Sequence, residues 1–170
     1  MKPVNEEVSL IDSIPGVGER SAQVSIAEIG ININQFPSAS HLASWAGLCP
    51  GNNESAGKRK NGKTRKGSDI LRATLIECAK VAGHLKNTYF SAQYKRIAAR
   101  RGHNRATVAV AHAILKAAYF MLKSNTPYKE LGPDFFELRR KTEIVKKSVK
   151  RLETLGFTVT IEQSVNASTA

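Results

Sequence analysis

One stretch of this sequence restricts the possible folds more than any other, the segment NRATVAVAHAILKAAYFMLK at residues 104–123. It is apolar on nearly every side of a helix, which is typical of a helix buried at the centre of a protein. Strand-like alternation is confined to GFTVTIEQ at the C-terminal end. Four further segments carry apolar stripes at helical spacing, namely residues 19–29, about 68–82, 88–100 and 134–155. The sequence therefore predicts an all-α helical bundle with a short C-terminal strand or extended segment.

These elements divide the chain into three parts. We expect residues 1–130 to form one helical domain, in which a turn lies within residues 10–30 and a polar loop covers residues 49–67. Residues 131–163 form a charged helical extension, and residues 164–170, SVNASTA, form a disordered tail. A chain of 170 residues is long enough for one domain with a core and an appendage.

Several residue types mark helix ends and core positions. Gly30 is expected to end the helix at 19–29, and either Ser38 or Ser40 to begin the next one. Aromatic residues at helical spacing are predicted to be core residues rather than stacking platforms for nucleobases: these are Trp45, Tyr89, Phe90, Tyr94, Tyr119 and Phe120.

The charge of the chain limits its partners. There are 26 Lys and Arg residues against 14 Asp and Glu, a net charge of +12, which favours a polyanionic partner. No apolar run is predicted to be long enough to span a membrane, so nucleic acid is the expected partner and a membrane is not. Cys49 and Cys78 are too few for a disulfide framework or a zinc site and are expected to be reduced thiols of a cytoplasmic protein.

The segment SIPGVGERSAQ places two glycines directly before a predicted helix. Gly16, Val17 and Gly18 would let a phosphate approach the backbone, where the first N–H groups of the helix favour an anion. A dinucleotide site would need a preceding strand and a glycine at position 21, which is Ser21. IPGVGERSAQVSIAEIG resembles a helix-hairpin-helix motif, which implies contacts to a nucleic-acid backbone without base reading. The alternative is a packed turn between two helices, without a ligand.

The loop CPGNNESAGKRKNGKTRKG at residues 49–67 is predicted to be irregular or a loose hairpin. It contains Ser55 followed by six cations, namely Lys58, Arg59, Lys60, Lys63, Arg65 and Lys66. Attack on phosphorus needs an accessible hydroxyl, a proton acceptor and cations near the phosphate. The loop offers access and cations, and Glu54 is its only obvious base. On composition alone, Ser55 is a turn residue.

Two other groups of cations are candidates for phosphate contacts. Arg72 follows the loop on the first turns of a predicted helix, whose N-terminus favours anions. The segment RIAARRGHNR surrounds a helix break at Gly102 with Arg96, Arg100, Arg101, His103 and Arg105, of which Arg100, Arg101 and Arg105 are the expected backbone-binding residues. Solvated surface charges are the alternative in both cases. His41, His84 and His112 lack the spacing of metal ligands, and no metal site is predicted.

Three ordered blocks resemble the C-terminal transposase domain of the IS-one-ten family of insertion sequences, over about residues 10–130. They are IPGVGERSAQVSIAEIG, then LASWAGLCPGNNESAGKRKNGKTRKGSDILRATLIECA, and then YFSAQYKRIAARRGHNRATVAVAHAILKAAYFML. Family members are guide-RNA-directed DNA recombinases. The family's serine falls on Ser55, so the resemblance implies that Ser55 attacks the DNA phosphodiester, with Lys58, Arg59 and Lys60 beside the phosphate. Ala56 stands where the family often has glycine.

In that family an N-terminal RNase H-like domain supplies acidic residues that bind Mg²⁺. No such domain precedes residue 1, so the chain is interpreted as a domain of a longer transposase or a degenerate one. The resemblance implies DNA as a partner, a guide RNA and a homo-oligomer in the full-length protein, and an inactive isolated fragment. A non-catalytic helix-hairpin-helix module that binds DNA or RNA is the alternative function.

Overall fold

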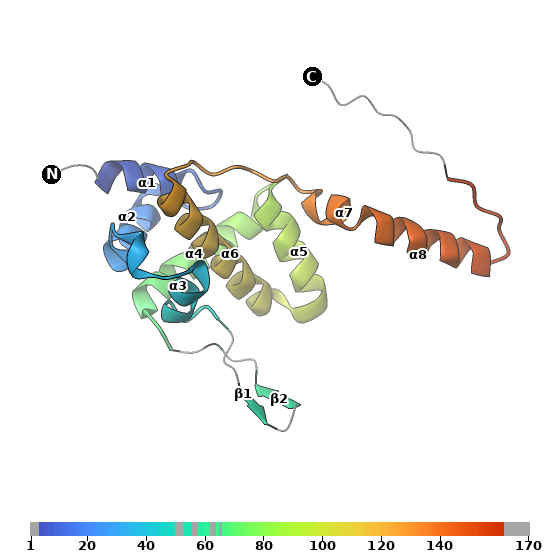
Figure 1. Cartoon of the computed structure of the whole chain (residues 1–170), viewed down its shortest axis with the longest axis horizontal. Helices are drawn as coiled ribbons and strands as arrows, with labels where there is room; N and C mark the ends of the chain where they lie inside the picture. Colours follow the sequence, from blue (N-terminus) through green and yellow to red (C-terminus); the bar gives the residue numbers. More distant parts are fainter. Residues whose placement is uncertain (1–3, 50–52, 56–57, 62–63, 65, 162–170) are drawn as a thin grey trace, which may run out of the picture. The chain divides into compact units, whose positions relative to one another are not determined.

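The computed structural model describes residues 4–49, 53–55, 58–61, 64 and 66–161. These residues form eight α-helices, one 3₁₀ helix and a two-stranded β-hairpin (Figure 1). The chain divides into two compact units, Met1–Asp134 and Phe135–Ala170. The helices of both units confirm the predicted all-α class, to which the hairpin adds a short ribbon.

The first unit begins with two helices joined by the glycine turn. α1 spans Val4–Asp12 and α2 spans Glu19–Ile29. Gly30 ends α2 with a φ of 79°, a conformation that favours glycine, as predicted. The sequence placed residues 1–12 in the helical domain but predicted no separate helix before residue 19, so α1 is an addition to the predicted elements. Its short length leaves few apolar positions, such as the buried Val8 and Ile11, and its periodicity is correspondingly weak.

A 3₁₀ helix and a short α-helix follow. η1 spans Ile33–Gln35 and α3 spans Ala39–Trp45. The Ser38 hydroxyl accepts a hydrogen bond from the His41 backbone N–H at 3.4 Å. Ser38, rather than Ser40, is therefore the residue that caps this helix.

Three longer helices complete the bundle. α4 spans Asp69–His84, α5 spans Tyr89–Arg101 and α6 spans His103–Ser124. The hydroxyls of Ser68 and Thr88 cap α4 and α5 by accepting from backbone N–H groups in the first turns. α6 packs against α1, α3, α4 and α5, which confirms the prediction of a central buried helix.

α6 also corrects one sequence prediction. By length and composition alone it is long and apolar enough to cross a membrane, although no such run was expected. Half of the qualifying window is buried inside the protein, and Ala106, Val110, Ala111, Ile114 and Leu115 are fully buried. The helix therefore has the burial of a core helix.

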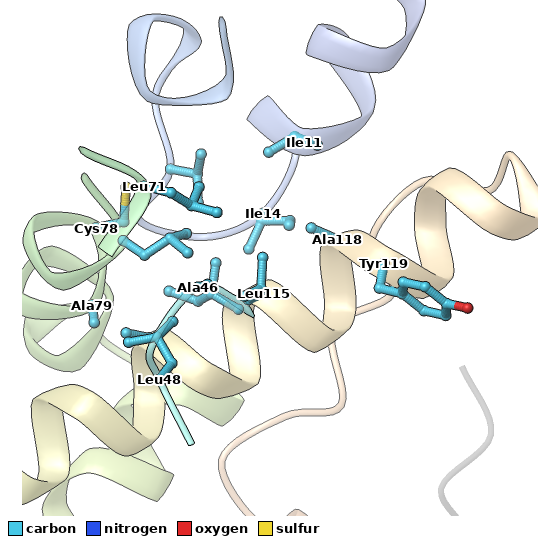
Figure 2. Packing of buried hydrophobic residues seen from close by; sticks show 14 of the residues in the cluster. Ile11, Ile14, Ala46, Leu48, Leu71, Cys78, Ala79, Leu115, Ala118 and Tyr119 are labelled. Atoms are coloured by element: carbon cyan, nitrogen blue, oxygen red, sulfur yellow. The ribbon is translucent and has the colours of Figure 1, made fainter. Parts of the chain in front are cut away.

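The core lies between α6 and the helices packed around it. Figure 2 shows Ile11 and Ile14, from the region of the glycine turn, near Leu115 and Ala118 of α6. Leu71 and Cys78 of α4, together with Ala46 and Leu48 after α3, belong to the same cluster. Burial raises the pKa of the Cys78 thiol. The cysteine thus packs as a small apolar side chain.

The basic loop contains a β-hairpin that projects from the helices (Figure 1). β1 spans Asn53–Ser55 and pairs antiparallel with β2, Lys58–Asn61. Ser55 pairs with Lys58 and Glu54 with Arg59, and the register is irregular between Asn53 and Glu54. Of the two predicted forms, loop or loose hairpin, the described residues adopt the hairpin.

The second unit differs from the prediction of one helix over 134–155. α7 spans Phe135–Arg139 and α8 spans Lys141–Thr154. Between them Arg140 leaves helical geometry, with a φ of −112° and a ψ of 10°. Its guanidinium lies 3.0 Å from Glu143, an ion pair across the first turn of α8. Large apolar side chains in this unit are exposed, including Leu138, Ile144 and Leu155.

For the C-terminal end the sequence predicted a short strand or an extended segment. Residues 157–161 belong to neither helix nor strand, so of these two forms the strand is not found among the described residues. An alternating sequence forms a strand only where a neighbouring strand completes its backbone hydrogen bonds, and the part of the chain that is described offers none here. Residues 162 and 163 and the predicted tail at 164–170 lie outside the described residues.

The aromatic residues predicted for the core divide into two groups. Phe90, Tyr94 and Tyr119 are buried and Tyr89 is half-buried. Trp45 is 42% exposed and Phe120 is 57% exposed, so the prediction was wrong for these two. Phe120 follows Tyr119 in the same helix, and consecutive helical residues point about 100° apart, so both cannot face the core. Trp45 is the last residue of α3.

Candidate nucleic-acid interface

The hairpin is anchored to the helices at the N-terminal end of α4. The Ser68 backbone N–H donates to the Trp45 carbonyl at 3.3 Å. At Gly67 a Cβ would come within 2.4 Å of the same carbonyl oxygen and 2.3 Å of the Gly47 nitrogen. Only glycine permits this close approach, which holds the returning strand of the loop against the end of α3.

Arg72 makes a second contact at this anchor. Its guanidinium donates to the Thr64 hydroxyl at 2.8 Å, which joins α4 to the residues after β2. Arg72 is half-buried. Its predicted phosphate contact stays a prediction, whereas the bond to Thr64 shows that Arg72 links α4 to the base of the hairpin.

Besides Ser55 on the hairpin, Ser68 lies at this anchor, and its hydroxyl both donates and accepts a hydrogen bond. It donates to the Glu28 carboxylate at the end of α2 at 2.7 Å and accepts from the Leu71 N–H at 3.2 Å. These bonds cap α4 and tie it to α2. Ser68 therefore has a structural role that accounts for both of its hydrogen bonds.

The hairpin brings together the predicted nucleophile and some of the cations predicted to lie beside the phosphate. By register, Ser55 lies directly opposite Lys58, and Arg59 and Lys60 follow in the same strand. Lys63 and Arg65 lie outside the described residues. Lys66, on the return to α4, is exposed. One serine and several cations thus share a ribbon that stands apart from the packed core.

The glycine turn lies at the opposite end of α4. Gly16 has a φ of 88°, and a Cβ there would lie 2.6 Å from the Ala82 Cβ and 2.7 Å from the Ala82 nitrogen. Val17 is buried. Since Ala82 and Ser68 are fourteen residues apart at about 1.5 Å per helical residue, the two features are separated by roughly 21 Å along α4.

The three residues of the turn differ in what they can contact. Gly16 is packed against α4, and Val17 belongs to the hydrophobic core. Gly18 is exposed and has open space around its α-carbon. It is the N-cap residue of α2, so no side chain accepts a hydrogen bond from the first N–H groups of that helix. Among the three, Gly18 and the first N–H groups of α2 are the groups that an anion can reach.

A third basic surface surrounds the junction between α5 and α6. Arg101, Gly102, His103, Asn104 and Arg105 line a shallow hollow there, and Arg100, Arg101 and Arg105 are all exposed. The N-terminus of α6, at the same junction, has no side-chain cap for its first N–H groups. An uncapped helix N-terminus beside exposed arginines favours an anion, and the backbone contact of these arginines stays a prediction.

Two titratable residues lie beside a pocket between α5, α6 and the segment after α6. His112 is half-buried and lines this pocket together with Lys116, Gln93 and Tyr128. Burial, and then the charge of Lys116, lower the pKa of His112. Burial and the nearby Glu130 carboxylate raise the pKa of Tyr128. These groups belong to the helical body, and no predicted site residue lines the pocket.

The described residues do not fit a metal site. Among them, no group of three or more His, Cys, Asp and Glu side chains is arranged to hold a metal ion. Mg²⁺ chemistry is therefore not assigned to any residue described here.

The sequence missed three residues that shape this region. Trp45 was predicted to be a core residue, and Thr64 and Glu28 had no predicted role, yet they contact the hairpin anchor or the cap of α4. Each contact joins residues far apart in the chain. A local sequence pattern carries no signal for such pairs.

Residues 8–95, just over half of the chain, match the transposase IS116/IS110/IS902 family. This region includes the glycine turn, α4 and the whole hairpin. The chain belongs to this family. The resemblance found in the sequence blocks is thereby confirmed.

Several curated proteins are similar to about three quarters of the chain. The transposase for insertion sequence element IS1111A of Coxiella burnetii is 33% identical over 129 residues, covering 74% of this chain and 35% of that protein. The insertion element IS110 uncharacterized 43.6 kDa protein of Streptomyces coelicolor is 31% identical, covering 76% of this chain and 32% of that protein. The pilin gene-inverting protein of Moraxella bovis is 27% identical, covering 74% and 39%. The chain thus spans about a third of the length of these relatives.

Proposed function

We propose that this chain is the DNA-binding and nucleophile-bearing part of a transposase or DNA invertase. One observation carries the proposal, namely the hairpin register that sets Ser55 opposite Lys58 on a ribbon projecting from the helices. A nucleophile that must enter a DNA groove or strand junction needs this separation from the packed core. The net charge of +12 supports a polyanionic substrate.

The proposed chemistry is transesterification at a DNA phosphodiester. The Ser55 oxygen attacks phosphorus, an Oγ–P bond forms and the bond from phosphorus to the 3′ oxygen breaks. The serine proton passes to a base and the leaving 3′ oxygen takes up a proton. The DNA strand is left attached to Ser55 through its 5′ phosphate. Lys58, Arg59 and Lys60 stabilise the charge that develops on the phosphate oxygens.

The remainder of the site is proposed to come from outside this chain. Glu54 is the only obvious candidate base in the loop sequence, and the residues described here form no metal cluster. We therefore assign the Mg²⁺ of the full-length protein to an RNase H-like acidic domain outside these 170 residues. The guide RNA and a homo-oligomeric complex are assigned to the full-length protein in the same way. Residues 1–170 alone are expected to bind DNA without cleaving it.

The other basic surfaces are proposed to hold the DNA backbone. Gly18 and the N-terminus of α2 form the phosphate contact of a helix-hairpin-helix motif, while Gly16 and Val17 hold its turn against α4. Arg100, Arg101 and Arg105 form a further backbone contact at the uncapped start of α6. Arg72 and Lys66 extend the basic surface from the hairpin onto α4.

A non-catalytic helix-hairpin-helix module is the second candidate function. The exposed, uncapped N-terminus of α2 favours it, because it needs nothing from the hairpin. The two candidates differ in one product. A recombinase leaves DNA covalently attached to Ser55, and a binding module leaves none.

Covalent trapping on the full-length transposase tests the proposal. The protein is incubated with labelled DNA carrying its target junction, and adducts that survive denaturing electrophoresis are counted. Ser55→Ala should abolish the adduct while DNA affinity changes little, since a neutral hydroxyl contributes about 0.5–1.5 kcal/mol. Ser68→Ala is the matched control and should retain the adduct. An adduct that persists in Ser55→Ala would place the nucleophile elsewhere.

A further inference from the structure

The exposed indole of Trp45 stands beside the place where the hairpin joins the helices. Its backbone carbonyl accepts the Ser68 N–H at 3.3 Å, and Gly67 packs directly against the same carbonyl. The side chain is 42% exposed. A large aromatic surface therefore remains open beside the point where the loop that carries the hairpin returns to α4.

The ring is held in place from one side. The Phe36 ring lies against it at a centroid distance of 5.5 Å and an interplanar angle of 55°. Phe36 is itself fixed, because its carbonyl accepts the Tyr119 hydroxyl of α6 at 3.0 Å. The indole is thus supported by the helical body and needs little ordering before it receives a partner.

We propose that Trp45 is a stacking platform for one unpaired nucleobase of the DNA strand held by the hairpin. Stacking on an aromatic ring is tolerant of base identity, because every base has a π-face. Lys66 is exposed on the return to α4, and the Arg72 guanidinium bonds Thr64 in the same segment, so the anchor carries positive charge that favours the phosphates of a bound strand. The inference rests on the proposed function and adds to it a contact that only an unpaired nucleotide can make.

The chemistry of the site favours a nucleotide over a protein partner. An apolar protein surface would need a wider apolar patch around Trp45, whereas the adjoining loop at residues 49–67 carries six lysines and arginines among its 19 residues. A fully paired duplex keeps its bases stacked on each other and offers the ring no free face. The platform therefore distinguishes a strand with an unpaired base from intact duplex.

Intrinsic fluorescence gives a direct test, because the chain contains one tryptophan. Residues 1–170 are titrated with a single-stranded oligonucleotide, the matching duplex, and the same duplex carrying one unpaired nucleotide. Binding is followed separately by the anisotropy of a label on the DNA. Indole emission should be quenched by the single strand and by the duplex with an unpaired nucleotide, and much less by the fully paired duplex.

Variants separate stacking from a merely structural role. Trp45→Leu should weaken single-strand binding at least about fivefold and leave duplex binding within about twofold, whereas Trp45→Phe should restore most of the loss. Phe120→Leu, which alters another exposed aromatic residue, is the control and should change neither. If Trp45→Leu fails to fold, the wild-type quenching decides the question. Binding without quenching would overturn the platform alone, and no binding to any of these DNAs would overturn the proposed function as well.

Discussion

Two glycine-containing segments lie at opposite ends of α4, and the sequence offered both as phosphate sites. The structure separates them. At the C-terminal end of α4, Gly16 is packed within van der Waals distance of Ala82, and Val17 belongs to the core. At the N-terminal end, the glycine-rich segment opens into a hairpin whose register pairs Ser55 with Lys58. The same residue type serves close packing at one end and a projecting ribbon at the other.

The comparison shows what decides the role of a glycine turn. Glycine permits both a close helix contact and a close ligand contact, so its presence does not distinguish them. The residues next to the glycines are more informative. Val17, between Gly16 and Gly18, is buried and fixes the first turn to the core. The loop before α4 instead offers lysines and arginines, and its sequence over 53–61 has no apolar anchor.

The largest effect expected from a test of this comparison is the loss of stability when a glycine of the first turn is replaced by alanine. Gly16→Ala should lower the free energy of unfolding by about 2–5 kcal/mol, because it adds a Cβ against Ala82 and forces a positive φ on alanine. Gly18→Ala has open space and a φ of −107°, and should cost about 1 kcal/mol or less. Urea denaturation of both variants measures the difference. Equal losses would show that Gly16 is not fixed by packing.

The second test concerns the other end of α4. Replacing Lys58, Arg59 and Lys60 with alanine should leave stability within about 0.5 kcal/mol, since these residues lie on the projecting ribbon. The log–log slope of DNA affinity against salt should become shallower by up to about 2.7, because each phosphate that is no longer neutralised removes about 0.9 from the slope. Fluorescence anisotropy at several salt concentrations measures that slope. An unchanged slope would remove the hairpin from the DNA interface.

The two serines near the hairpin give the third test. Ser68→Ala removes the cap of α4 and the 2.7 Å bond to Glu28, and should lower stability by about 1–2 kcal/mol. Ser55→Ala should leave thermal stability nearly unchanged. Denaturation midpoints of the two variants, measured side by side, compare them. A large loss of stability in Ser55→Ala would give that residue a structural role.

The sequence allowed the helices with strong periodicity to be predicted. The segments at 19–29, 88–100 and 104–123 lie close to α2, α5 and α6 because each buries a regular apolar stripe. α1 was missed because its short length gives little periodicity. The segment at 134–155 has a regular stripe as well, yet it forms two helices and leaves large apolar side chains exposed. Periodicity identifies helical segments, but it does not reveal whether another element covers them.

The candidate site was predictable only in part. Local chemistry singled out Ser55 and its neighbouring cations, and the structure joins several of them on one hairpin. The anchor was not predictable, because the contacts Arg72–Thr64, Ser68–Glu28 and Gly67–Trp45 depend on how distant helices pack. The exposure of Trp45 depends on the same packing.

The smallest expected effect is a change in how the unfolding free energy depends on pH, which His112 should cause in the helical body and not in the hairpin. Burial and Lys116 lower the pKa of His112 in the folded protein, so the unfolded chain binds this proton more readily. Its contribution is therefore fully present above pH 6.5, the ordinary value, and stability falls as pH drops through that value toward the lower folded-state pKa. His112→Gln should flatten the dependence of the unfolding free energy between pH 5 and about 7.5, and Lys116→Gln should flatten it less, since burial is the larger cause. DNA affinity of the two variants, measured at pH 7.5, should change by no more than the effect of one phosphate contact, because neither residue lies on the hairpin.

A dependence of the unfolding free energy on pH that is identical in His112→Gln and in the unmodified chain would show that this histidine does not link protonation to folding.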